Sequence, residues 1–318
     1  DHAGVEGRAR GHRGIRSMRD AFAKTIYELA QKDERICVLV ADISPAGAME
    51  EFRAEFPSRF FNVGVAEQAM IGLAAGMAQR GLRPFCYTIA AFALFRPYEF
   101  IRCDLAYQDL PVTVVGMGAG LSYPTLGGTH QAIEDVAVAM ACPNLTVLAP
   151  CDPLEVAECV RWCAARDSGG PVYLRLGKAG EPDLTADAEP WKFGKMRWLR
   201  GGRARLNCED TCIVTYGPAA STALRVAELL VSRGDWVSVA CCSTLTQLDP
   251  EDLRMVERAR RCVVIEEASG APLASAIRGA VSRARSFALP SAFPHSYGTR
   301  EELLAASGLT AEAIFAKL

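Results

Sequence analysis

A single carboxylate stands in a markedly apolar part of the sequence. Glu67 lies in the stretch FFNVGVAEQAMIGLAAGMAQRGLRPF (60–85), between an apolar strand end and a helix of small residues. A helix N-terminus stabilises an anion through its dipole, whereas the neighbours Val65, Ala66 and Met70 keep water away from the carboxyl group. Glu67 is therefore either a helix-capping residue or an acid that is kept poorly hydrated for chemistry.

A histidine and two aromatic residues form the other candidates for chemistry. His130 follows two glycines in LGGTHQAIED and is expected to open a helix, with its imidazole in a strand-end crevice. There it can hydrogen-bond a substrate oxygen or transfer a proton. The alternative is a structural histidine that only hydrogen-bonds at the start of the helix. Phe92 and Phe95, in YTIAAFALFRPYEF, share a face if this segment is helical. They either belong to the core or flank a flat heteroaromatic ligand.

The elements that must position these residues alternate between strand and helix. Met18, Phe22, Ile26 and Leu29 recur at helical spacing and predict a helix at 17–31. Strands are expected at 35–42, 84–89, 111–117, 145–150 and 172–176, and helices at 66–80, 95–107, 131–141 and 153–165. Apolar strands that alternate with helices indicate a parallel sheet covered on both faces.

Ligands of such sheets bind at the carboxyl ends of the strands. This rule selects Asp42, residues 62–67, 88–95 and 117–130, and the segment from Arg175 to Lys178.

The alternation resumes later in the chain, which predicts a second, smaller α/β domain. Its strands are expected at 211–216, 236–240 and 262–267, and its helices at 219–233, 250–260 and 271–284. We expect both domains to be doubly wound. The predicted organisation is a disordered leader (1–16), a first domain (17–180), a linker (181–208) and a second domain (209–318).

Composition excludes several classes of protein. The net charge is −2, from 35 basic and 37 acidic residues, so neither nucleic acid nor a membrane is an expected partner. The 12 cysteines are irregularly spaced and have no C-x-x-C pair, which favours reduced, buried thiols in a cytoplasmic protein. No apolar run approaches the roughly 20 residues of a membrane span.

The sequence also has no diphosphate-binding loop of its own. It contains neither G-x-G-x-x-G nor G-x-x-x-x-G-K-[ST], and it has no G-D-G followed by a distant asparagine. A ligand with a diphosphate group would therefore need a second polypeptide.

Four segments together resemble the pyrimidine-binding half of transketolases: RFFNVGVAEQAMIGLAAGMAQRGLRPF, YTIAAF, GGTHQAIEDVAVAMACPNLTVLAPCDPLEV and GPVYLRL. The C-terminal part resembles the transketolase C-terminal domain, so that the similarity covers about residues 17–318. It is similar above all to the split form, in which separate subunits carry the diphosphate-binding and pyrimidine-binding halves. The absence of a diphosphate loop agrees with that form.

The resemblance implies thiamine diphosphate as cofactor and assigns roles to particular residues. Glu67 would hydrogen-bond N1′ of the aminopyrimidine, which favours the imino tautomer that removes the proton from C2 of the thiazolium. Phe92 would stack on the pyrimidine with Phe95 beside it, and Asp42 would lie near the cofactor. His130 would meet hydroxyl groups of the donor and acceptor substrates.

Departures from the family pattern point to an unusual substrate. Ile89 replaces a second phenylalanine beside the pyrimidine, and its side chain can still form a wall of that site. Gly118 and Ala46 replace a histidine and a serine that help to hold the acceptor phosphate in the family, and Leu126 replaces an aspartate that reads a sugar hydroxyl. A phosphate without ionic partners is costly to desolvate, although Arg175 or Lys178 could hold one anion.

We therefore expect a two-carbon ketol or acyl transfer in specialised metabolism, with a substrate that is not an ordinary sugar phosphate. The partner would be the diphosphate-binding subunit, in an α2β2 heterotetramer in which that subunit supplies the Mg²⁺ ligands. Three alternatives stay open. They are the β subunit of a 2-oxoacid dehydrogenase E1, a carboligase like 1-deoxyxylulose-phosphate synthase, and a non-catalytic scaffold. His295 could also face the cofactor from the second domain.

Overall fold

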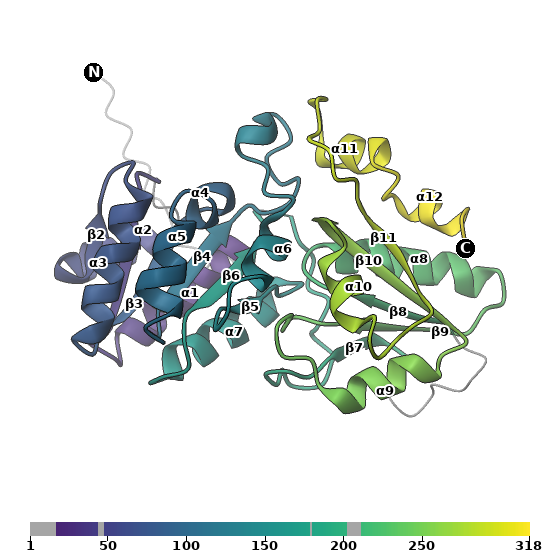
Figure 1. Cartoon of the computed structure of the whole chain (residues 1–318), viewed down its shortest axis with the longest axis horizontal. Coiled ribbons are helices and arrows are strands. Elements are labelled where there is room, and N and C mark those ends of the chain that lie inside the picture. The colour runs from purple at the N-terminus through teal and green to yellow at the C-terminus, as the bar shows by residue number, and fades with distance from the viewer. Residues whose placement is uncertain (1–16, 44–47, 179, 202–210) are drawn as a thin grey trace, which may run out of the picture.

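The computed structural model describes residues 17–43, 48–178, 180–201 and 211–318, and these form two α/β domains side by side (Figure 1). The predicted leader, Ala46 and part of the predicted linker lie outside the described residues. The expectation of two α/β domains is confirmed.

The first domain contains a six-stranded parallel sheet with strand order β2-β1-β3-β4-β6-β5. Its strands are β1 (Ile36–Val40), β2 (Phe60–Asn62), β3 (Arg83–Ile89), β4 (Thr113–Met117), β5 (Thr146–Leu148) and β6 (Val172–Leu176). Its helices are α1 (Met18–Ala30), α2 (Ala48–Glu55), α3 (Glu67–Gln79), α4 (Ala90–Leu94), α5 (Tyr98–Phe100), α6 (Asp135–Met140) and α7 (Pro153–Ala165). The 3-10 helices η1 (Pro57–Arg59) and η3 (Gly127–Thr129) and the π-helix η2 (Ile101–Ala106) complete it.

Alternate residues of each strand enter the cores on opposite faces of this sheet. In β1, Cys37 and Leu39 pack in the core that contains α3, whereas Ile36, Val38 and Val40 pack in the core that contains α1 and α7. Because both faces are covered, each strand is apolar along its whole length, as the sequence indicated. The strand order reverses at β1, so the carboxyl ends of β1, β2 and β3 lie next to one another, which is where such sheets bind their ligands.

The second domain has a five-stranded sheet of order β11-β10-β8-β9-β7, in which β7 runs antiparallel to β9. Its strands are β7 (Arg197–Arg200), β8 (Thr211–Thr215), β9 (Val237–Cys241), β10 (Arg261–Ser269) and β11 (Ala284–Leu289). Its helices are α8 (Ala219–Ser232), α9 (Pro250–Arg258), α10 (Pro272–Ile277), α11 (Arg300–Ala306) and α12 (Ala311–Phe315). The sheet is therefore mixed, and β7 lies inside the range that the sequence suggested as a linker.

Two predicted helices differ from the structure. The helix expected at 95–107 is the short helix α5 followed by the π-helix η2, whereas α4 ends before this range, and Pro97 is the N-cap residue of α5. The helix expected at 271–284 ends at Ile277, and the chain then enters β11. Only Phe287 and Leu289 of β11 are buried, so this strand gave too short an apolar pattern to be recognised.

A buried polar network joins the two domains. Arg175, at the carboxyl end of β6, donates to the Asp135 carboxylate at 2.9 Å and to the backbone oxygen of Glu267 at 3.0 Å. Tyr173 donates to the same Asp135 oxygen at 2.9 Å. Burial alone would lower the pKa of the Arg175 guanidinium, but the Asp135 carboxylate outweighs that effect and the pKa is raised. This network fixes β10 of the second domain against β6 of the first.

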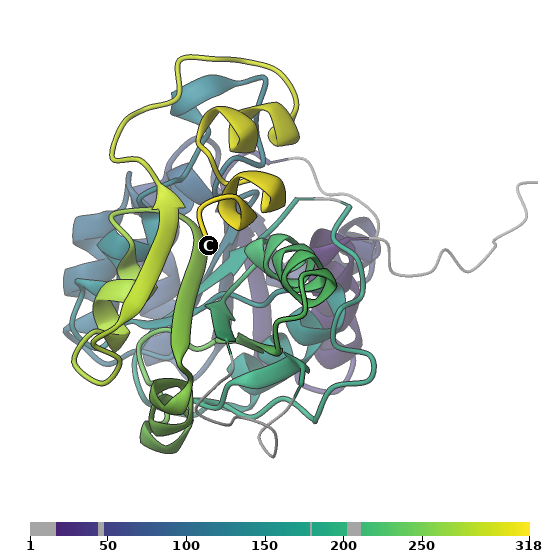
Figure 2. The ribbon, with the colours of Figure 1, turned by 90° about the vertical axis from the view of Figure 1, so that its right-hand side faces the viewer.

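The second domain also holds the long loop that follows β4. Glu267 accepts a hydrogen bond from the backbone of Leu121 at 2.8 Å, and its other carboxylate oxygen pairs with Arg300. The segment before α11 lies beside this loop in both ribbon views (Figures 1 and 2), where Tyr297 approaches Gly127. Contacts from a different domain therefore set the shape of the loop that carries His130.

The described cysteines are all free thiols, and all except Cys103 are buried. Burial raises the pKa of the Cys37 thiol to about 12, which makes it a poor nucleophile. The prediction of reduced, buried thiols is thus confirmed for these residues, and Cys208 lies outside the described part of the chain.

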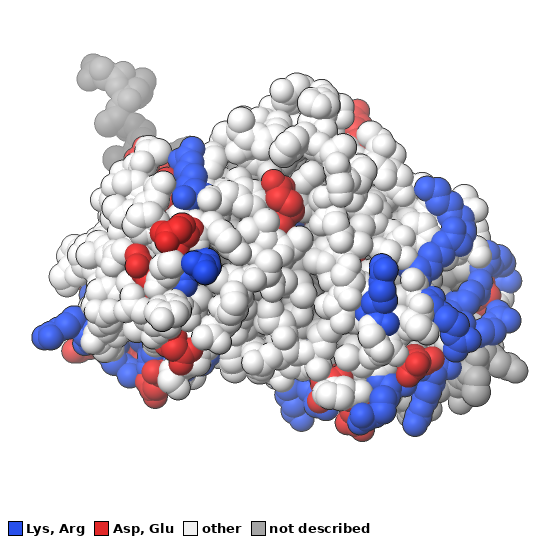
Figure 3. All heavy atoms as spheres, viewed as in Figure 1, with Lys and Arg blue, Asp and Glu red and all other residues white. Residues whose placement is uncertain are grey.

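Charged side chains are unevenly distributed on the face shown in Figure 3. Lys and Arg gather at the end formed by the second domain, and only a few charged side chains lie in the broad area in the middle. No helix among the described residues is long and apolar enough to cross a membrane.

We predict that Asp135→Asn destabilises the chain by about 3 kcal/mol, because it leaves the buried Arg175 guanidinium without its counter-charge. Urea unfolding measures this change. The exposed pair Arg225–Glu228 provides the control, since Glu228→Gln should cost about 0.5 kcal/mol or less. Equal effects of the two substitutions would show that the interdomain network contributes little.

Candidate active site

Glu67 is the first residue of α3, and its side chain is 3% exposed. The turn before it uses Gly64 at φ 72°, and Ala66 is the N-cap residue without a side-chain cap. Ala74 and Ala75 are buried on the helix, which lets α3 pack closely on the sheet. One Glu67 oxygen accepts a hydrogen bond from Arg96 at 2.9 Å. A buried carboxylate therefore lies at the point where β1, β2 and β3 end.

Phe92 lies on α4, which follows β3, and is partly buried against a cluster of small residues. These residues are Ala90, Ala91, Ala119 and Ala132. The Arg96 guanidinium lies over the Phe92 ring, with its central carbon 4.0 Å from the ring centroid. The same guanidinium thus links Phe92 to Glu67.

His130 extends this group on its other side. The centroids of the His130 and Phe92 rings lie 5.1 Å apart in an edge-on arrangement. Thr129 Oγ1 lies 2.9 Å from His130 Nδ1. The expectation that His130 opens a helix is wrong, because it is the C-cap residue of η3 and α6 begins at Asp135. The contact with Thr129 occupies Nδ1, which leaves Nε2 for another partner.

Tyr123 is a residue that sequence reasoning missed. The centroid of its buried ring lies 5.8 Å from the centroid of the His130 ring. Lys178 Nζ lies 4.2 Å from the centroid of the Tyr123 ring. Burial raises the pKa of the Tyr123 phenol. Gly118 has φ 71°, and a Cβ atom at this position would overlap the Tyr123 ring. A histidine at 118, as in the common family pattern, is therefore incompatible with this tyrosine.

The structure brings Glu67, Phe92 and His130 into one contiguous group, with Arg96 between the first two. Tyr123 connects Lys178 to the same group. The signal for Arg96 was in the sequence, because it is the one cation in the run YTIAAFALFRPYEF. Tyr123 carried no comparable signal.

Other predicted residues lie apart from this group. Arg175 uses its guanidinium in the interdomain network, and Asp42 is exposed, with its backbone N–H bonded to Asn62 at 3.1 Å. Ile89 is half-buried against the core that contains α1 and α7. Phe95 is the exception, because it is half-buried against the same alanine cluster as Phe92 and so borders the group. His295 is exposed, on the segment before α11.

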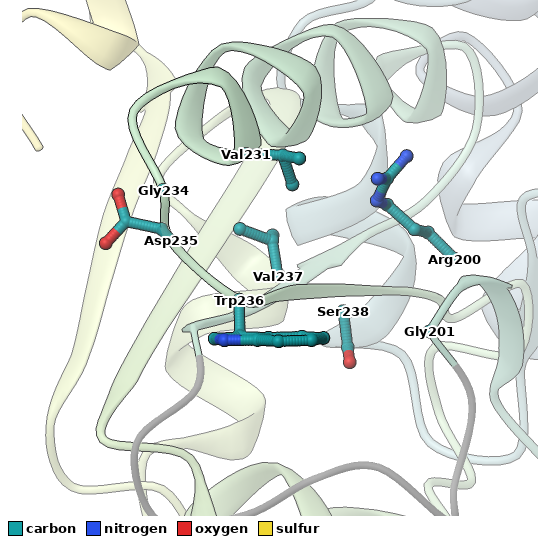
Figure 4. Close-up of a pocket in the computed structure, with 8 residues that line it drawn as sticks. All are labelled: Arg200, Gly201, Val231, Gly234, Asp235, Trp236, Val237 and Ser238. Atoms are coloured by element: carbon teal, nitrogen blue, oxygen red, sulfur yellow. The ribbon is translucent and has the colours of Figure 1, made fainter.

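A cavity of about 390 Å³ lies in the second domain, away from these residues. Figure 4 shows the Trp236 indole along one side of it, with Val231 and the Arg200 side chain on the other. None of the predicted site residues lines it. The candidate site lies instead at the carboxyl ends of the strands of the first sheet.

Comparison with known proteins agrees with the fold and with the resemblance found in the sequence. Residues 16–180 match the family model described as the transketolase pyrimidine binding domain, and residues 202–314 match the transketolase C-terminal domain.

Two relatives and one solved structure illustrate the similarity. A transketolase-family protein of Sinorhizobium fredii is 37% identical over 284 residues, which cover 86% of this chain and 79% of that protein. The 6-deoxy-6-sulfo-D-fructose transketolase subunit of a Clostridium species is 34% identical over 253 residues, covering 79% of this chain and 76% of the subunit. A split-gene transketolase, described as an inactive β4 tetramer, has a TM-score of 0.83 and 33% identity, covering 95% of this chain and 97% of that one. The chain therefore belongs to the transketolase family and consists of its pyrimidine-binding and C-terminal domains.

Proposed function

We propose that this chain is the pyrimidine-binding subunit of a split, thiamine diphosphate-dependent transketolase. The observation that carries this proposal is the buried Glu67 carboxylate beside the flat ring of Phe92. When bound, thiamine diphosphate supplies a carbon nucleophile and an electron sink for breaking a carbon–carbon bond next to a carbonyl group.

The residues present fit the aminopyrimidine part of this cofactor. A ring nitrogen needs a poorly hydrated carboxyl group, and a flat ring needs an aromatic face. The planar guanidinium of Arg96 makes both of these contacts at once, which supports a flat nitrogen-containing ring as ligand. Glu67 would hold the proton at N1′, Phe92 would orient the ring, and Ile89 and Phe95 would complete the apolar wall.

His130 is suited to act on substrate oxygens. Phe92 and Thr129 fix the position of its ring, and Nε2 is left to bond a hydroxyl group or to move a proton there. Asp42 follows β1 at the same edge of the sheet, and we retain it as a cofactor neighbour.

The loop after β4 supports a substrate other than an ordinary sugar phosphate. Tyr123 fills the space beside Gly118, and Leu126 is 48% exposed where the family has an aspartate. Lys178 is half-buried above Tyr123 and can hold one anionic group. Arg175 already has two partners, which makes Lys178 the better candidate. The Clostridium relative is named for a sulfo-sugar, which is consistent with substrate variation among split subunits.

An apolar stripe beside Glu67 supports assembly with a second subunit. Val65 is 70% exposed and Leu73 is 42% exposed, and Ala69 and Gly76 are exposed on the same face of α3. We propose that the diphosphate-binding subunit covers this stripe in an α2β2 heterotetramer and brings the Mg²⁺ ligands. The sequence lacks a diphosphate loop, so the other half of the cofactor needs that partner.

The alternative functions would require different properties of this chain. A 2-oxoacid dehydrogenase subunit would pass an acyl group to a lipoyl domain, and a scaffold would keep the fold without needing Glu67. The contact between buried Glu67 and Arg96, and the placement of His130 beside Phe92, favour a catalytic subunit over a scaffold.

We predict that Glu67→Gln, in complex with the partner subunit, lowers kcat by about 10²–10⁴, because an amide cannot share a proton with the ring nitrogen in the same way. Steady-state kinetics with saturating cofactor measures the loss. The matched control is Glu34→Gln, an exposed glutamate at the amino end of β1, which should leave kcat unchanged. A fully active Glu67→Gln complex would favour the scaffold.

We predict slow turnover of xylulose 5-phosphate with ribose 5-phosphate by the assembled complex, with kcat/KM below about 10³ M⁻¹s⁻¹. The physical reason is the loss of a phosphate partner at Gly118 and of a sugar-hydroxyl partner at Leu126. An ordinary transketolase serves as the positive control in the same assay. Values near 10⁵ M⁻¹s⁻¹ or above, within the usual range of good enzymes, would refute the unusual substrate.

We predict that Leu73→Glu weakens association with the diphosphate-binding subunit by about tenfold or more, because it places a charge in a buried apolar contact. Sedimentation of the mixed subunits measures the association. Leu154→Glu is the control, since Leu154 is a partly exposed leucine on α7, which packs on the opposite face of the sheet. Unchanged assembly of the Leu73 variant would mean that α3 is not part of the interface.

A further inference from the structure

The Arg96 guanidinium makes the two contacts that the proposed function assigns to the coenzyme. It donates to a Glu67 oxygen at 2.9 Å, and its central carbon lies 4.0 Å from the centroid of the Phe92 ring. The Glu67 side chain is 3% exposed, whereas the Arg96 side chain is 42% exposed. A buried acid is thus paired with a cation that reaches it from the surface.

Both contacts involve the same face of Phe92. One guanidinium touches Glu67 and the ring together, so it lies on the face of Phe92 that is directed towards Glu67. An aminopyrimidine that stacks on Phe92 and bonds Glu67 must lie on that face too. The space in van der Waals contact with this face of the Phe92 ring holds only one planar group at a time. Arg96 and the aminopyrimidine therefore exclude each other.

We propose that Arg96 is a positioning residue that competes with the aminopyrimidine of thiamine diphosphate, and that the coenzyme displaces it when it binds. This inference depends on the proposed function. Before the exchange, Arg96 satisfies a buried carboxylate that would otherwise lack a partner, which is the costly state for such a group. After the exchange, N1′ of the coenzyme satisfies it.

The surroundings permit this exchange. Arg96 follows Phe95, the C-cap residue of α4, and precedes Pro97, so its side chain leaves the chain between two short helices. It can swing towards solvent without breaking the hydrogen bonds of a helix interior. Phe92 stays in place, because the alanine cluster covers part of it and His130 contacts it. The exposed Arg96 side chain can therefore leave while Glu67 and Phe92 stay in place.

If Arg96 competes with the coenzyme, removing its guanidinium should strengthen coenzyme binding, whereas most substitutions in a binding site weaken it. Arg96→Met keeps a long side chain but removes the hydrogen bond and the charge, so the free site no longer opposes the coenzyme. We expect thiamine diphosphate to bind about tenfold more tightly, which corresponds to the loss of one charge-assisted hydrogen bond from the free state. Titration calorimetry on the complex with the diphosphate-binding subunit, in the presence of Mg²⁺, measures this Kd without any turnover.

Arg102→Met is the matched control, since Arg102 is an exposed arginine of η2, six residues further along the chain, and should leave the Kd unchanged. Arg96→Lys is a second variant in case the methionine variant folds poorly. Lysine keeps a charge for Glu67 but presents no planar group to Phe92, so a smaller gain in affinity is expected.

A tenfold weaker Kd for either Arg96 variant would overturn the proposal, because it would make Arg96 a contact of the bound coenzyme. A crystal structure of the loaded complex gives an independent test. We expect the guanidinium to lie beyond about 6 Å from the Phe92 ring, outside cation–π range, and finding it still stacked there would also overturn the proposal. If the wild-type complex and all variants fail to bind thiamine diphosphate, the proposed function itself is wrong.

Discussion

A buried carboxylate must keep a partner, and this requirement organises the first domain around Glu67. The side chain lies at the amino end of α3, where three parallel strands end and the strand order reverses. Water is largely excluded there, so a cation or a ring nitrogen has to satisfy the acid. Arg96 supplies the cation, and Phe92 supplies the face on which a flat partner rests. Under the proposed function, these three side chains would set the position of the coenzyme.

The second domain acts on the site indirectly, through the loop after β4. Glu267 bonds the backbone of Leu121 and accepts Arg175 through its own backbone oxygen, so one residue of β10 anchors both the loop and β6. Tyr123 and His130 lie on that loop. Their positions therefore depend on how tightly the two domains pack. This gives the C-terminal domain a physical role in shaping the loop that carries His130, although Glu67 and Phe92 come from the first domain.

The continuous apolar strands of the first sheet could be predicted because both of their faces are buried. β1, β3 and β6 lie where the sequence indicated. Elements with weak or mixed patterns could not be predicted. β2 has three residues, none fully buried, and β11 buries one face at one end. β7 has partly exposed residues and belongs to its sheet through hydrogen bonds to β9, which a local pattern does not record.

The sequence by itself determined the family, the alternation of strands and helices, and the identity of Glu67, Phe92 and His130 as candidates for chemistry. These depend on local patterns and motifs, which a single chain carries in order. The tertiary structure decided that Arg96 stands between Glu67 and Phe92, that Tyr123 excludes a side chain at 118, and that Arg175 joins the domains. Each of these facts depends on contacts between residues far apart in sequence or on the exact volume left between them. Packing sets both, and no local pattern encodes them.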